Sequence, residues 1–131
     1  GATRSVFGGG NTKFSWSVIA PATTGDVCIE KGAAVTLARA FTSTATEAEI
    51  IDGATNARAR VAWAAGAAEA PWPAAFAPKV GTVYEVIPRE GQRRQIRLRF
   101  IDKAMTDDEN ALLALIEQGC RDQVRLWIRQ K

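Results

Sequence analysis

The chain has 131 residues, 47% of them hydrophobic and 24% charged, which is typical of one globular domain and argues against a disordered chain. Its formal net charge is +3, and it contains no histidine. This removes the commonest general base, the usual activator of a serine or cysteine nucleophile and the commonest zinc ligand. The composition therefore argues against a hydrolase triad and most zinc chemistry. It predicts a protein that is not an enzyme and holds no cofactor or metal.

The positive charge is concentrated in the C-terminal third. Residues 1–88 carry seven basic and seven acidic side chains, whereas residues 89–131 carry ten basic and seven acidic ones. A basic surface can meet phosphate groups, because neutralising them releases counterions. The sequence favours the alternative, a solvated face of a sheet.

The two cysteines, Cys28 and Cys120, are too few and too far apart for a metal-ligand spacing or a redox pair. The sequence favours two buried thiols and leaves one disulfide as the alternative, since cysteine is so often simply buried. No apolar run reaches the roughly 20 residues of a membrane span, and no signal segment opens the chain. We therefore expect synthesis in the cytoplasm.

Residues 1–13 are rich in glycine and small polar residues and predict a flexible N-terminal arm, which includes Phe7. The glycines at 8–10 follow no predicted strand and precede no predicted helix, which favours an arm over a phosphate-binding loop. Residues 14–131 are expected to form a single β-rich domain.

Three strands are predicted in the first third of this domain, over residues 14–19, 26–30 and 33–41, with a turn at Pro21. Large apolar residues alternate with small or polar ones in the first and third strands. The buried faces are expected to carry Phe14, Trp16 and Val18 in the first strand, and Val35, Leu37 and Phe41 in the third.

Residues 42–70 are ambiguous between helix and strand. Thr46 is a candidate helix cap, followed by glutamates near the favourable end of a helix dipole. Further along, Val61 and Trp63 alternate with Arg58 and Arg60, which favours a strand over an alanine-rich helix. Residues 70–78 contain three prolines and predict an ordered loop over the core. Trp72 and Phe76 would anchor this loop, or would pack on a neighbouring subunit.

From residue 82 the pattern is clearer. Residues 82–87 and 94–101 flank a turn with proline and glycine and predict a β-hairpin. Its second strand directs Ile96, Leu98 and Phe100 to one side and Arg97 and Arg99 to the other.

A helix is predicted over residues 107–118. Thr106 and Glu109 have the spacing of a capping box, and Gly119 is placed to end the helix. The acidic residues at 107–109 fit the helix dipole better than a magnesium site. The expected buried stripe consists of Leu112, Leu113 and Ile116.

The last segment predicts a strand, with a helix as the alternative. Its apolar residues Val124, Leu126 and Ile128 alternate with Arg125, Trp127 and Arg129. Arg97, Arg99, Arg125 and Arg129, with Trp127 among them, would then form one outer sheet face. Such a face suits protein contacts, or single-stranded nucleic acid whose bases stack on the aromatic ring. Further candidates for subunit contacts are Phe7, Trp16, Trp72 and Phe76.

The order QIRLRFI, TDDENALLALIEQG and DQVRLWIRQ resembles the corresponding region of major tail tube proteins of long-tailed bacteriophages. The resemblance implies a β-sandwich or barrel with one flanking α-helix at about 107–118. It also implies a virion structural subunit that assembles with itself as hexameric rings and with other virion proteins, after synthesis in the host cytoplasm. The net positive charge departs from the acidic lining expected of a DNA conduit.

A second resemblance, to the small coat proteins of RNA phages, would bring the arginine face to RNA. It requires two terminal helices, whereas the final segment favours a strand. A nucleic-acid-binding module that uses the same face is the alternative function.

Overall fold

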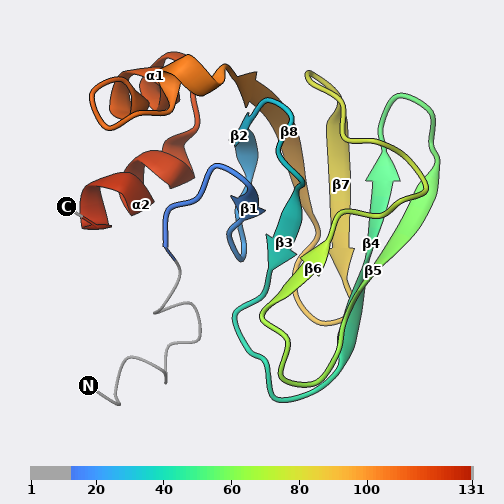
Figure 1. Cartoon of the computed structure of the whole chain (residues 1–131). Coiled ribbons are helices and arrows are strands. Elements are labelled where there is room, and N and C mark those ends of the chain that lie inside the picture. Colours follow the sequence, from blue (N-terminus) through green and yellow to red (C-terminus); the bar gives the residue numbers. More distant parts are fainter. Residues whose placement is uncertain (1–12, 131) are drawn as a thin grey trace.

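The computed structural model describes residues 13–130, and its architecture is mainly β, as predicted (Figure 1). The predicted arm lies outside the described residues apart from Lys13, and so does Phe7. One sheet has three strands in the order β1-β3-β6, and the other has five in the order β2-β8-β7-β4-β5. The strands are β1 (Val18–Ile19), β2 (Gly25–Glu30), β3 (Thr36–Ala38), β4 (Thr46–Asp52), β5 (Arg58–Trp63), β6 (Glu69–Pro71), β7 (Val83–Pro88) and β8 (Arg94–Ile101).

The main core lies between the two sheets, because one side of each long strand is apolar. In β8, Ile96 and Leu98 are almost fully buried, while Arg97 and Arg99 lie on the opposite face. β7 and β8 pair antiparallel, which confirms the predicted hairpin. The buried residues of this core are Ile19, Val27, Ile29, Val35, Leu37, Ala48, Ile50, Val61, Trp63, Ala70, Trp72, Tyr84, Val86, Ile96 and Leu98.

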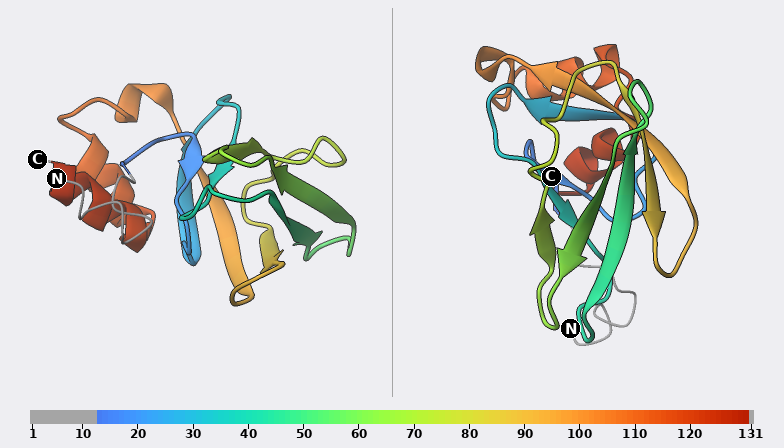
Figure 2. Two further views of the ribbon diagram at one scale, coloured as in Figure 1. Left: turned by 90° about the horizontal axis from the view of Figure 1, so that it is seen from below. Right: turned by 90° about the vertical axis from the view of Figure 1, so that its right-hand side faces the viewer.

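A second apolar cluster lies on the outer face of β2 and β8, under two C-terminal helices. The short helix η3 (Lys103–Met105) leads from β8 into α1 (Ala111–Glu117) and α2 (Arg121–Gln130). Both helices sit beside the β2 end of the larger sheet, away from β4 and β5 (Figures 1 and 2). The buried residues of the cluster are Cys28, Ile101, Ala111, Ala114, Leu115, Cys120 and Trp127.

The predicted C-terminal strand is wrong, since residues 121–130 form helix α2. Gln123 and Trp127 are four residues apart and therefore share the buried side of this helix. The sequence of residues 121–130 fits the period of a helix as well as the alternation of a strand. Packing against β2 decides between them, because the helix buries Trp127, which the strand would have left outside.

Helix α1 is shorter than predicted and is capped differently. It begins at Ala111 with Asn110 as its N-cap residue, and Gly119 with φ of 76° follows its end as expected. The hydroxyl of Thr106 donates to the backbone oxygen of Lys103 at 2.7 Å, so the predicted capping box with Glu109 is absent. The acidic residues 107–109 precede the helix and do not lie in its first turn.

Residues 46–52 form strand β4, which excludes the helical alternative, and the strand predicted around Val61 and Trp63 is confirmed as β5. β4 pairs with β5 on one side and β7 on the other. As a strand between β5 and β7, β4 can form backbone hydrogen bonds on both sides and bury Ala48 and Ile50. This gain outweighs the local preference for a helix that the cap-like residue Thr46 suggests.

The second predicted strand, at 26–30, is confirmed by β2, whereas the first and third are shorter than predicted. β1 covers only Val18–Ile19, and it buries Ile19 more deeply than Val18. Phe14 and Trp16 instead pack against the helical cluster. The third predicted strand is reduced to Thr36–Ala38, and Phe41 is 68% exposed, contrary to its predicted burial.

Candidate functional site

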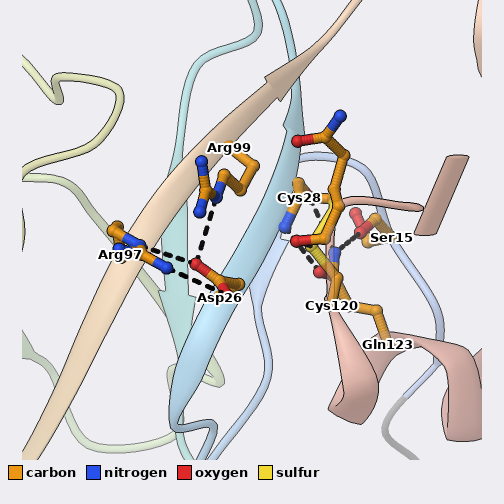
Figure 3. The surroundings of a disulfide bond; sticks show 8 residues. Ser15, Asp26, Cys28, Arg97, Arg99, Cys120 and Gln123 are labelled. Carbon is orange, nitrogen blue, oxygen red and sulfur yellow. Dashed lines mark hydrogen bonds and ion pairs between the residues drawn. A yellow bond between two sulfur atoms is a disulfide. The ribbon is translucent and has the colours of Figure 1, made fainter. Parts of the chain in front are cut away.

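A disulfide joins Cys28 of β2 to Cys120, the residue between α1 and α2 (Figure 3). The preference for two free thiols is therefore wrong. Both residues are completely buried, but their separation of 92 residues hid their proximity in the sequence. The bond ties the helices to the outer face of the sheet.

Gln123 of α2 reinforces this junction. Its side-chain oxygen accepts from the backbone N–H of Cys28 at 2.6 Å, and its side-chain nitrogen donates to the Cys28 carbonyl at 2.7 Å. Next along β2, the N–H of Glu30 donates to the carbonyl of Trp16 at 2.8 Å. These contacts occupy polar groups on the side of β2 away from β8.

Asp26 lies beside this junction and binds two of the predicted arginines (Figure 3). Its carboxylate accepts from Nε of Arg97 at 2.8 Å and from Nε of Arg99 at 3.1 Å. The hydrogen bond from Arg97 lowers the pKa of Asp26; burial opposes this effect, and the bond from Arg99 adds to it. Arg97 and Arg99 are thus joined by a shared acid within the chain.

The predicted arginine face is therefore divided between two elements. Arg97 and Arg99 lie on β8, whereas Arg125 and Arg129 lie on α2. Trp127, expected among them on the surface, is 7% exposed and contacts the ring of Phe14 edge-on at 5.2 Å between centroids. The single sheet face predicted for nucleic acid does not exist.

Helix α2 instead carries a line of arginines. Arg121, Arg125 and Arg129 are four residues apart, so they lie along one side of the helix, and all three are exposed. A long contact of 3.7 Å joins Arg125 to Asp122. The helical alternative for this segment would have predicted this line.

Trp72 and Phe76 anchor their loop to the core, as predicted. The indole Nε1 of Trp72 donates to the carbonyl of Phe76 at 2.9 Å, and its ring packs edge-on against Tyr84 at 4.9 Å. Burial raises the pKa of the Tyr84 hydroxyl, which accepts from the backbone N–H of Lys79. With Trp72 only 8% exposed, the side chain serves the core of this subunit.

Trp16 is only partly buried and packs edge-on against Phe14, with 4.8 Å between ring centroids. It belongs to the edge of the helical cluster. Trp16 and Phe76 are the two predicted aromatic contact residues within 13–130 that are only partly buried, and Phe76 packs on the main core.

Helix α1 has an apolar side that faces away from the core. Of its predicted buried stripe, Leu112 packs against the helical cluster, but Leu113 is 52% exposed and Ile116 57% exposed. Ala111, Ala114 and Leu115 occupy the inner side instead. The predicted buried stripe is therefore wrong for Leu113 and Ile116, which lie on the outer side of the helix.

The outer face of the larger sheet is charged and internally paired. Glu49 of β4 accepts from Arg58 of β5 at 2.9 Å, and Glu85 of β7 accepts from Arg93 at 2.8 Å. Glu47 accepts from Arg89 at 2.7 Å. These pairs are exposed, so each contributes little to stability.

A pocket of about 590 Å³ opens at the end of the sandwich where β4 and β8 begin, the lower end in Figure 1. Its lining includes Ala48, Trp63 and Val86 from the inner faces of three strands, together with Arg94. Arg94 lies two residues before the buried Ile96, so both side chains point to the same face of β8. This spacing is the sequence signal that could have predicted that Arg94 points inward. Burial lowers the pKa of its guanidinium.

Within residues 13–130, no group of three or more histidine, cysteine or carboxylate residues could hold a metal ion. None of the helices in this range has the length and apolar character needed to cross a membrane. No protein-family model, curated protein or solved structure matches the chain.

Proposed function

We propose that the protein is a self-assembling structural subunit of a virion, forming stacked hexameric rings of a tail tube. The observation that carries the proposal is the pair of large apolar residues on the outer side of α1. Leu113 and Ile116 are three residues apart and more than half exposed. Removing such side chains from water favours association by about 25 cal/mol per Å² of apolar surface.

The way in which the helices are held on the sheet supports a contact between Leu113, Ile116 and another copy of the chain. The disulfide and Gln123 fix the helical pair to the sheet, so the apolar side is presented without much conformational freedom. A rigid surface loses little entropy when it binds. Additional contacts would come from Trp16 and from other virion proteins.

The test is the mass of the particle in solution, measured by light scattering after size exclusion and by negative-stain imaging. The wild-type chain is expected to form rings, and Leu113→Glu with Ile116→Glu is expected to remain a monomer. Val80→Glu is the matched control, because Val80 is as exposed as Ile116, at 57%, but lies next to the sheet. A wild-type protein that stays monomeric at high concentration would refute the proposal.

A second candidate is a coat subunit of the RNA-phage kind that binds nucleic acid. The two terminal helices and the line of Arg121, Arg125 and Arg129 favour it. Side chains four residues apart on a helix can contact successive phosphates, and such binding weakens steeply as salt rises.

Oligonucleotide binding at low and high salt tests this candidate. Replacing all three helix arginines by glutamine should weaken binding strongly and reduce its dependence on salt. The charge-matched control replaces Arg58, Arg60 and Arg89, which lie on or beside the outer sheet face and form ion pairs with glutamates. An equal loss of oligonucleotide affinity in both triple variants would show that binding depends on net charge alone and not on the line of arginines on α2.

A further inference from the structure

We propose that the pocket at the end of the sandwich binds an organic anion, with Arg94 holding a carboxylate or phosphate group and the apolar walls holding an attached hydrocarbon or ring. This inference does not depend on assembly. It rests on Arg94, a charged residue on the face of β8 that otherwise carries the buried apolar residues.

Arg94 opens β8 on its inner side. It is the register partner of Val86, which is 1% exposed, and it precedes the inward-facing Ile96 by two residues. Its Nε atom is buried and has no hydrogen-bond partner within residues 13–130. An unsatisfied polar atom of a charged group is costly in such a place, so its retention needs an explanation.

The other arginines around the pocket already have partners. Arg39 donates to four backbone carbonyls, Arg89 pairs with Glu47, and Arg93 pairs with Glu85. Within the described range, no ion pair includes Arg94. Among the described residues that line the pocket, its guanidinium is therefore the cation that remains without a partner.

Acidic side chains near the pocket do not supply this compensation. Glu47 lines the pocket, but its carboxylate is shared between Arg89 at 2.7 Å and Arg60 at 3.7 Å. Glu90 lies on the rim in the exposed turn between β7 and β8. An anion that entered from outside would pair with Arg94 without breaking an ion pair of the fold.

The shape and lining of the pocket define the ligand class. A volume of about 590 Å³ suits a small molecule, and the walls include the side chains of Trp63, Val86 and Pro88. Guanidinium presents donors in a planar fork that matches carboxylate and phosphate oxygens. The pocket thus combines one anion-binding group with apolar side chains on part of its lining.

The experiment is an NMR titration of the full chain with hexanoate, hexyl phosphate and neutral 1-hexanol. Saturable shifts are expected at the amides of Ala48, Val86 and Arg94 with at least one anion, and about tenfold weaker binding of the alcohol. The ratio of the two anion affinities identifies the preferred head group. Absence of saturation by both anions at about 10 mM, or equal binding of 1-hexanol, would overturn the proposal.

Two substitutions separate the pocket from general charge effects. Arg94→Gln should weaken anion binding about tenfold, while Arg93→Gln, the neighbouring rim arginine paired with Glu85, should leave it within about threefold. Arg94→Met should also lose the anion and should unfold at higher urea, because a partly buried guanidinium with a buried, unsatisfied Nε is removed. Wild-type affinity in Arg94→Gln, or a less stable Arg94→Met, would overturn the role assigned to Arg94.

Discussion

The side-chain amide of Gln123 pairs with the backbone of Cys28 as a neighbouring strand would. Its oxygen accepts from the N–H at 2.6 Å, and its nitrogen donates to the carbonyl at 2.7 Å. Gln123 is 5% exposed, so neither backbone group has easy access to water. A helix residue thereby covers part of a strand edge that would otherwise be open to another chain.

We expect Gln123→Ala to lower the free energy of unfolding by about 2–3 kcal/mol, because two buried backbone groups lose their partners. Urea denaturation followed by circular dichroism measures this change. Gln130→Ala, on the exposed end of the same helix, is the control and should change stability by less than about 0.5 kcal/mol. Equal effects of the two substitutions would contradict the role of Gln123.

Loss of the disulfide should lower the free energy of unfolding by about 2–4 kcal/mol, because the bond closes a long loop in the unfolded chain. The closing residues are 92 apart in sequence. Urea unfolding with and without reductant measures the effect, and Cys28→Ala with Cys120→Ala should reproduce it. That double variant should not respond to reductant. A wild-type midpoint unchanged after complete reduction would contradict the prediction.

Asp26→Asn should cost about 1 kcal/mol near neutral pH, since the bonds to Arg97 and Arg99 lose their ionic character and the arginines are partly exposed. The pKa of Asp26 is lowered in the folded state from 3.8. Its stabilising contribution is therefore complete well above that value and is lost as pH falls through the lower folded pKa.

Urea unfolding near neutral pH and at about pH 2 tests this dependence. The difference between the wild-type chain and Asp26→Asn should shrink at the acidic pH. Glu117→Gln, on the exposed end of α1, is the control for the general effect of removing a negative charge. If the stability difference between the wild-type chain and Asp26→Asn increased at the acidic pH, the prediction would be wrong.

Gly53→Ala should destabilise the protein by about 1–3 kcal/mol, because overpacking forces a shift of the backbone. The N–H of Gly53 donates to the carbonyl oxygen of Val83 at 2.9 Å, and a Cβ on Gly53 would overlap that same oxygen. Thermal unfolding compares it with Ala54→Ser, an exposed position in the same turn. An unchanged midpoint in Gly53→Ala would show that β4 and β7 separate easily at this point.

Several features of the protein follow from the sequence alone because they depend on near neighbours. Alternation in residues 82–87 and 94–101, with a turn between them, is sufficient to predict the hairpin and the sides taken by Leu98 and Arg97. Prolines around Trp72 predict an ordered loop, and Gly119 predicts the end of α1.

The tertiary structure decided what the local pattern left open. Residues 121–130 satisfy both a strand and a helix pattern, and the helix prevails because it buries Trp127 and brings Gln123 to Cys28. The disulfide and the division of the arginines between β8 and α2 depend on the same packing. Contacts between residues nearly a hundred positions apart have no signature in a local period, so they emerge only when the chain is folded.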